Sequence, residues 1–249
     1  MSVNYHAYQN RGYLLGEHEA DAEQWYEKFN GYDPERIAGI LGLQRDDDYL
    51  YIPYFDDLYR LVLTTGRLER KIKPGEPDRE IRHIHTGEPD LPEQRPSGRS
   101  TAKEERTWTE NVFFNEGMAL YHVLLYTADT PRYAGVWVPG SALDGVVSRN
   151  PAVNDPLLAP FAGRFSGRCG AFRRACEAFG GTDIKKGDAG YQFRAFSFLP
   201  MQVIFWDRDE DFDAQVQVLF DQYVTDYIHF ETTGCLISDL FEKLCVLDA

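Results

Sequence analysis

Residues 187–223 read GDAGYQFRAFSFLPMQVIFWDRDEDFDAQVQVLFDQY, and this stretch decides the fold class. Two apolar, aromatic-rich runs meet at Leu199-Pro200. A group of acidic residues then separates them from a third run, in which apolar and polar residues alternate. Such runs are typical of β-strands, and the alternation predicts that one face is more buried than the other. We therefore expect strands here, with Val216, Val218 and Phe220 on the buried face of the last one.

Further strand patterns precede this stretch. Residues 49–55 and 58–65 are rich in β-branched and aromatic side chains, and Asp56-Asp57 lies between them. This order predicts a hairpin, which residues 67–72 extend. Residues 135–138 predict one more short strand.

Apolar residues at helical spacing predict helices between and around these strands. Asp33 and Pro34 supply an N-cap and a first-turn proline, and Gly42 supplies a C-cap. Thr107 and Glu110 have the spacing of a capping box for a central buried helix. The expected helices cover residues 20–29, the stretch from Pro34 to Gly42, and residues 112–126, 169–179 and 233–244.

The order of these elements predicts an α+β fold. Strands and helices are interspersed without a regular βαβ rhythm, so we expect a mixed, largely antiparallel sheet with flanking helices. Residues 1–249 are long enough for a single domain. Residues 73–106 contain five prolines and the tetrapeptide GEPD twice, which predicts a surface loop or insertion, or alternatively an ordered hairpin extension. Residues 150–167 are rich in Pro and Gly and are expected to be irregular.

Composition limits the partners and the location of the protein. The formal net charge is −14, whereas phosphate binding needs a clustered basic surface, so we expect no nucleic-acid partner. No run approaches the roughly 20 apolar residues of a membrane helix, and no basic amphipathic face favours a membrane surface. The first residues show no secretory signal, and the four cysteines form no C-x-x-C pair. We therefore expect reduced thiols in a cytoplasmic protein.

The acidic group after Trp206 is the sharpest candidate for a metal site. Acids at every second position of an extended segment point the same way, and hard cations prefer several such oxygens. The spacing imitates an EF-hand loop, but Phe212 and Val218 occupy the positions that need glycine and glutamate. A solvated turn between two strands is the alternative. The candidate metal ligands are Asp207, Asp209, Asp211, His229 and Glu231.

The candidate ligand-binding residues are Trp206, Asp188 and Arg168. Arg168 belongs to a basic cluster at the start of an expected helix, where an anionic group could bind. Pairing with surface carboxylates is the alternative for these arginines, and an Asx-turn is the alternative for Asp188. We find no phosphate loop, dinucleotide fingerprint or nucleophile elbow, so the sequence indicates neither an enzyme class nor a cofactor.

With these residues in view, the chain resembles domain-of-unknown-function family 3786. Weaker similarity covers residues 124–126 with Gly135 and Trp137, and residues 49–55 are a further candidate, so the resemblance spans about two thirds of the chain. Residues 73–106 look like an addition of this member. The strongest similarity lies in Gly180-Gly181, Gly187-Asp188, Leu199-Pro200, Trp206, the acids with Phe212, Leu219-Phe220-Asp221 and Glu231.

The resemblance implies a soluble bacterial or archaeal domain, and it supplies no activity, substrate or catalytic residue. Some members are joined to a four-cysteine iron–sulfur segment, which would imply anaerobic redox or corrinoid metabolism. The cysteine spacing of this chain does not provide that segment.

Three functional hypotheses follow. The first is an accessory domain that binds a small molecule or a partner protein in an aromatic-lined cleft near Trp206 or Trp137, because the chain holds 15 Tyr and 16 Phe. The second is a metal-dependent enzyme that uses the acids of residues 207–213. The third is a homo-oligomeric subunit whose strands pair across an interface.

Overall fold

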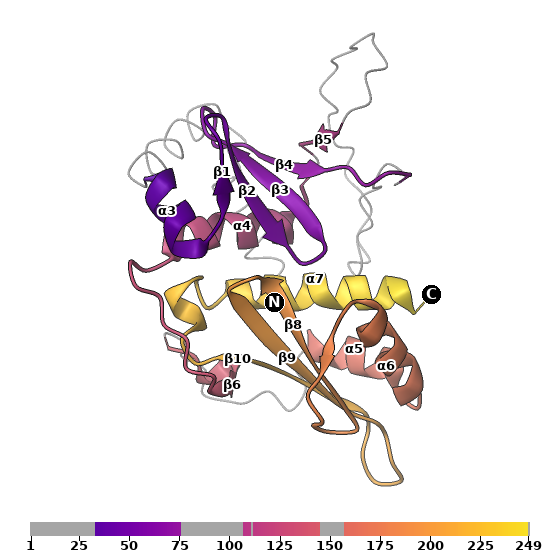
Figure 1. Cartoon of the computed structure of the whole chain (residues 1–249). Helices are drawn as coiled ribbons and strands as arrows, with labels where there is room; N and C mark the ends of the chain where they lie inside the picture. The colour runs from indigo at the N-terminus through magenta and orange to yellow at the C-terminus, as the bar shows by residue number, and fades with distance from the viewer. Residues whose placement is uncertain (1–32, 76–106, 111, 145–156, 249) are drawn as a thin grey trace, which may run out of the picture.

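The computed structural model describes residues 33–75, 107–110, 112–144 and 157–248, which form an α+β fold (Figure 1). The strands of these residues build two antiparallel five-stranded sheets. In spatial order, the first sheet holds β1 (Gln44–Arg45), β2 (Tyr49–Tyr54), β3 (Asp57–Val62), β4 (Leu68–Lys71) and β5 (Trp108–Thr109). The second holds β6 (Trp137–Pro139), β10 (Gln215–Asp221), β9 (Leu199–Trp206), β8 (Ala189–Phe196) and β7 (Thr182–Asp183).

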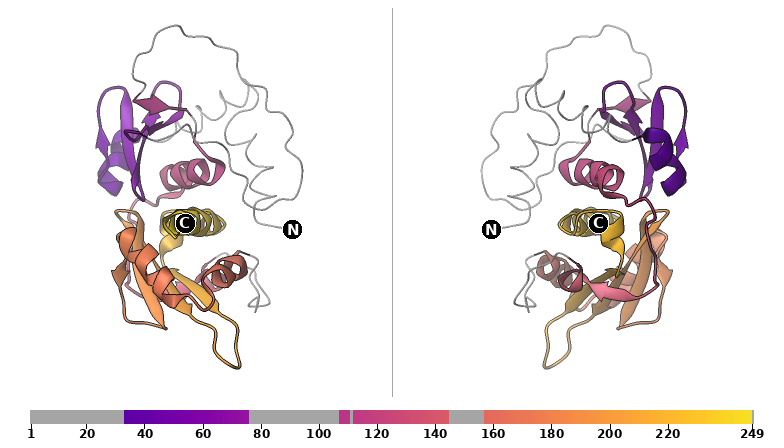
Figure 2. Two further views of the ribbon diagram at one scale, coloured as in Figure 1. Left: turned by 90° about the vertical axis from the view of Figure 1, so that its right-hand side faces the viewer. Right: turned by 90° about the vertical axis from the view of Figure 1, so that its left-hand side faces the viewer.

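Helices pack against both sheets. Two of them, α4 and α7, lie side by side in the middle of the molecule, with the first sheet beside α4 and the second beside α7 (Figure 2). The α-helices are α3 (Pro34–Leu41), α4 (Phe114–Tyr126), α5 (Leu158–Phe165), α6 (Cys169–Ala178) and α7 (Thr232–Leu247). None of the helices in the described ranges has the length and apolar character needed to cross a membrane.

Local sequence patterns placed several elements correctly. Asp33 caps α3 by accepting a hydrogen bond from the Glu35 N–H at 3.0 Å, and Gly42 ends that helix with a φ of +66°. The hairpin of β2 and β3 is confirmed, and β4 extends it. On β10, Val218 and Phe220 are buried as predicted, whereas Val216 is only half-buried and Leu219, expected on the more exposed face, is buried as well.

The predicted α+β fold with largely antiparallel pairing is confirmed, and its strands divide into two sheets without a shared pairing. The turn within the second sheet lies earlier than predicted. Pro200 belongs to β9 and lies opposite Arg194, next to an irregular step in the pairing of β8. Proline is tolerated at such a step because the ladder does not require its missing N–H.

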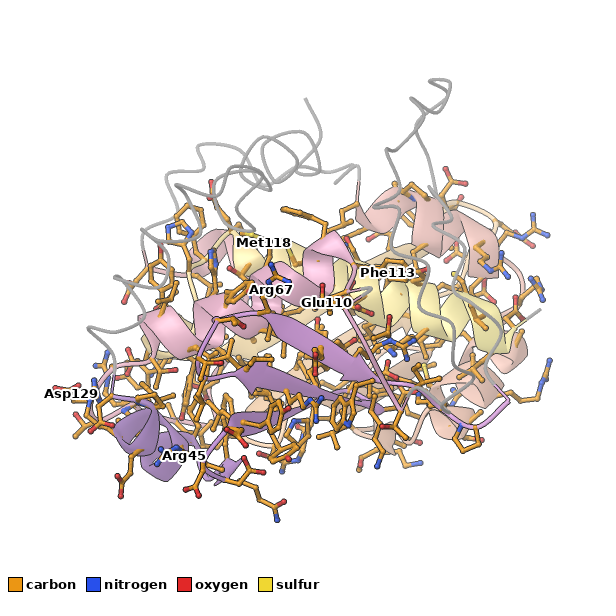
Figure 3. All side chains as sticks on the ribbon, turned by 90° about the horizontal axis from the view of Figure 1, so that it is seen from above. Arg45, Arg67, Glu110, Phe113, Met118 and Asp129 are labelled. Carbon is orange, nitrogen blue, oxygen red and sulfur yellow. The ribbon has the colours of Figure 1, made fainter. Side chains whose placement is uncertain are left out.

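The predicted capping box was also wrong. Residues 108–109 form β5, and Glu110 lies 3.5 Å from Arg67 as an ion pair (Figure 3). The helix begins later, at Phe114, where Glu116 accepts a hydrogen bond from the Phe113 N–H at 3.0 Å.

Residues 158–165 are helical rather than irregular. In α5, Phe161 and Phe165 lie one turn apart and are buried, so burial of aromatic rings outweighs the local Pro and Gly content. The expected helix at 20–29 lies outside the described residues, as does the expected loop at 73–106 apart from residues 73–75.

One continuous hydrophobic core joins the two sheets. At its centre the hydroxyl of Tyr54 on β2 donates a hydrogen bond of 2.6 Å to Asp239 on α7, and both side chains are buried. The ring of Tyr54 also lies 4.9 Å from the ring of Phe196 on β8. Burial raises the pKa of Asp239 well above its usual value, so a neutral carboxyl is favoured in the folded protein.

We predict that Asp239→Asn is at least as stable as the wild type at pH 7. The raised pKa means that the folded chain holds a proton that the unfolded chain releases above about 3.8, so wild-type stability falls as pH rises from there. The advantage of Asp239→Asn in urea unfolding should therefore grow between pH 5 and pH 8. Tyr54→Phe should instead cost about 1–3 kcal/mol, because it leaves Asp239 without its donor. An equal loss in both variants would contradict this account.

Candidate functional site

A cavity of about 310 Å³ lies where the two sheets meet. It lies at the edge of β8, beyond the end of β7, which pairs only with Tyr191 and Gln192. Its exposed walls are mainly polar and also include three aromatic rings. The lining residues are Phe55, Asp56, Phe179, Gly180, Thr182, Gln192, Phe193 and Arg194.

The turn between β2 and β3 forms one wall of this junction cavity. The Phe55 N–H donates a hydrogen bond of 2.7 Å to the Ala195 carbonyl, which lies on the edge of β8. Phe55 has a φ of +48°, a left-handed conformation that is unfavourable for a bulky side chain. Strain of this kind concentrates at functional sites, where the surrounding structure holds it in place.

The segment that follows α6 forms the opposite wall. The Gly181 N–H donates to the Cys176 carbonyl at 2.8 Å, so the chain turns tightly over the ring of Phe193. A Cβ atom at Gly181 would lie 2.7 Å from that ring and 2.9 Å from the Cys176 carbonyl oxygen. The ring of Phe179 lies 6.1 Å from that of Phe193 and 6.0 Å from that of Phe55. The three rings thus form one aromatic group within a lining that is otherwise mainly polar.

A network of charged groups lies beside the cavity. Asp56, on the rim, bonds to Lys73 at 2.6 Å and also to Lys243, and the fully buried Asp57 carboxylate lies 2.7 Å from Lys243. Burial acts to raise the pKa of Asp57, but Lys243 and Lys73 outweigh it and lower the pKa to about 2. Both aspartates therefore carry a charge that lysines already neutralise.

Arg194 has a different environment. Its guanidinium is exposed and donates a hydrogen bond of 2.7 Å to the Ser197 carbonyl. Among the described residues, no carboxylate lies within ion-pairing distance of Arg194, although it lines the cavity. The guanidinium of Arg194 can therefore bind an anionic group in the cavity.

The three sequence-predicted ligand residues lie elsewhere, and their role stays a prediction. Trp206 ends β9 with 39% of its surface exposed. Asp188 accepts a hydrogen bond of 2.8 Å from the Asp207 N–H, and Arg168 forms an ion pair of 2.8 Å with Asp248. The expected cleft near Trp206 or Trp137 differs from the junction cavity, which neither tryptophan lines.

The predicted metal ligands do not converge in the described residues. Asp207 accepts bonds from the Gly167 N–H at 2.6 Å and the Cys169 N–H at 3.1 Å, and thus holds the start of α6. Asp209 binds backbone N–H groups of its own turn, as expected of a solvated turn. Within the described ranges, no group of three or more His, Cys, Asp or Glu side chains is placed to hold a metal ion.

His229 and Glu231 do lie together, with His229 Nδ1 and a Glu231 carboxylate oxygen 3.5 Å apart. The sequence analysis missed their neighbour His122, on α4, whose ring lies 6.2 Å from that of His229. His122 Nδ1 is hydrogen-bonded to the Thr232 hydroxyl at the start of α7. A single histidine within an apolar helix gives no pattern that would connect it to a residue more than a hundred positions away.

We predict that Gly181→Ala destabilises the protein, because its methyl group has no space beside Phe193 and Cys176. Overpacking of this kind typically costs about 1–3 kcal/mol. The matched control is Gly163→Ala on α5, where nothing lies within 4 Å of the added methyl group. Alanine in a helix should stabilise that site by roughly 0.5–1 kcal/mol. Similar urea midpoints for the two variants would contradict the tight turn at Gly181.

We also predict that His122 stays neutral down to acidic pH. Burial, together with the charge of His229, lowers the pKa of His122 from 6.5 to about 4. The unfolded chain therefore binds a proton near pH 6.5 that the folded chain does not bind, and the free energy of unfolding falls as pH drops through this window. His122→Gln should weaken this dependence in urea unfolding at pH 7.5 and 5. In an NMR titration, a His122 midpoint near 6.5 would refute the prediction.

A comparison with protein families agrees with the sequence resemblance. The model of the domain of unknown function DUF3786 matches residues 94–242, which is more than half of the chain. The match includes Phe179, Phe193 and Arg194 of the cavity, while residues 49–55 lie outside it and residues 94–106 of the expected insertion lie inside it. Comparisons with curated proteins and with solved structures gave no match. The chain therefore belongs to the DUF3786 family of domains of unknown function.

Proposed function

We propose that this protein is a binding domain that takes a small molecule into the junction cavity. The observation that carries the proposal is the composition of the cavity. Three phenylalanine rings provide apolar surface, and Asp56 and Arg194 place opposite charges at the rim. Small-molecule sites are concave and hold a few well-placed polar groups, and a volume of about 310 Å³ falls at the lower end of their usual range.

The construction of the cavity supports this proposal. The backbone bond between Phe55 and Ala195 fixes one wall, and the turn at Gly181 fixes the other. Phe55 of one wall and Phe179 of the other both pack against the shared core, so the site is largely formed before a ligand arrives. A preformed site avoids part of the ordering cost of binding.

The metal-dependent hypothesis has less support from the described geometry. A metal-dependent enzyme would need a ligand set, and the acids of residues 207–213 are bound to backbone N–H groups or exposed in their turn. The proposal is therefore limited to small-molecule binding.

The test uses saturation-transfer NMR on the full chain with a set of single-ring fragments. We expect binding to the wild type and loss of binding in Thr182→Trp, whose indole would fill the cavity from an exposed lining position. Gln215→Trp is the matched control, because it adds the same ring at an exposed position of β10 outside the cavity. Fragments that bind Thr182→Trp as well as the wild type would refute the proposed site, as would the absence of any binding.

A further inference from the structure

One wall of the junction cavity presents hydrogen-bond donors from the second sheet. Thr182 on β7 lies directly opposite Gln192 on β8, and Arg194 follows two residues along β8. Side chains at positions i and i+2 of a strand point to the same face and lie roughly 7 Å apart, and directly paired residues lie closer still. A hydroxyl, an amide and a guanidinium are thus gathered on this wall.

A chain of hydrogen bonds fixes the orientation of the Gln192 amide. Lys186 Nζ donates to Gln202 Oε1 at 3.3 Å, and Gln202 Nε2 donates to Gln192 Oε1 at 3.2 Å. A lysine ammonium can only donate, so it selects the oxygen of Gln202, and the nitrogen of Gln202 then selects the oxygen of Gln192. Gln202 is buried, so its amide depends on these two partners. The NH₂ group of Gln192 is therefore left as a donor without an acceptor among the described residues.

Arg194 is the charged donor on the same wall. Its Nη1 donates to the Ser197 carbonyl at 2.7 Å, which holds the guanidinium in place. Within the described ranges, its Nε and Nη2 atoms have no hydrogen-bond partner, and neither does the Thr182 hydroxyl. Nε and Nη2 share one edge of the planar guanidinium, and such an edge binds the two oxygens of a carboxylate as a bidentate pair.

The acidic group of the lining offers no comparable site for a cation. Asp56 Oδ2 accepts a hydrogen bond from Lys73 at 2.6 Å, and Asp56 Oδ1 accepts one from Lys243. A cationic ligand would have to compete with both ammonium groups. A ligand with oxygen acceptors would instead meet the three donor groups of the opposite wall, which makes an anionic, hydrophilic ligand the better match.

We infer that the junction cavity selects a small hydrophilic carboxylate, bound through the free edge of the Arg194 guanidinium and through a second oxygen on Gln192 and Thr182. This inference rests on the proposed small-molecule function and adds the chemical class of the ligand. Succinate is a simple probe, because it carries a carboxylate at each end of a short chain. Succinamide has a similar shape without the charge, and inorganic phosphate is an oxyanion without a planar carboxylate.

NMR titration of the isotope-labelled full chain tests the inference, because it reports both the affinity and the site. Succinate should shift the signals of the Arg194 Nε–H and the Gln192 NH₂ group. It should bind roughly tenfold or more tightly than succinamide, because charge-assisted hydrogen bonds are the stronger ones, and it should also bind more tightly than phosphate. Arg194→Gln should remove the preference for succinate over succinamide. Arg174→Gln, at an exposed position of α6 outside the cavity, is the matched control and should keep that preference.

The outcomes separate this inference from the proposed function beneath it. Equal binding of succinate and succinamide, or a succinate preference that survives Arg194→Gln, would overturn the carboxylate assignment, as would phosphate binding as tight as that of succinate. Loss of the preference in Arg174→Gln would assign it to general surface charge and would also overturn the assignment. If single-ring fragments bind in the cavity and succinate does not, the assignment fails while small-molecule binding stands. If neither fragments nor succinate bind the wild type, both fail.

Discussion

The hydrogen bond from the Phe55 N–H to the Ala195 carbonyl joins the backbones of the two sheets directly, next to the hydrophobic core that they share. It binds the turn of the first sheet to the edge of β8 in the second, where β7 has already ended. Next to it, Tyr54 reaches across the core to Asp239 and packs against Phe196. An open strand edge would leave backbone groups without partners. The same contact that satisfies this edge also positions the aromatic wall of the junction cavity.

Two parts of the chain line the cavity, and the family model matches only one of them. Phe179, Phe193 and Arg194 lie in the segment that matches the DUF3786 model, whereas Phe55 and Asp56 lie before it. The matched segment provides the tight turn and the guanidinium. The first sheet provides the third ring and the paired carboxylate. The cavity is thus lined both by residues inside the family match and by residues before it.

The sequence could predict those features that depend on interactions between neighbouring residues. The caps of α3 and the hairpin of β2 and β3 depend on neighbouring residues, and these predictions were confirmed. The division into two sheets depends on which distant strands pair, and α5 forms because its phenylalanines are buried by other elements. The cavity and the partners of His122 likewise depend on contacts between residues far apart in sequence. No spacing rule within one segment encodes such contacts, so the candidate site could not be found from the sequence.

A crystal structure of the chain soaked with a single-ring fragment that binds it in solution tests the central claim most directly, because it locates the ligand without relying on a variant. We expect density for the fragment in the junction cavity, against the residues that line it. The backbone bond between Phe55 and Ala195 should be intact in that structure. A fragment bound only at another surface, or an empty cavity at a saturating fragment concentration, would contradict the assignment of the junction cavity as the binding site.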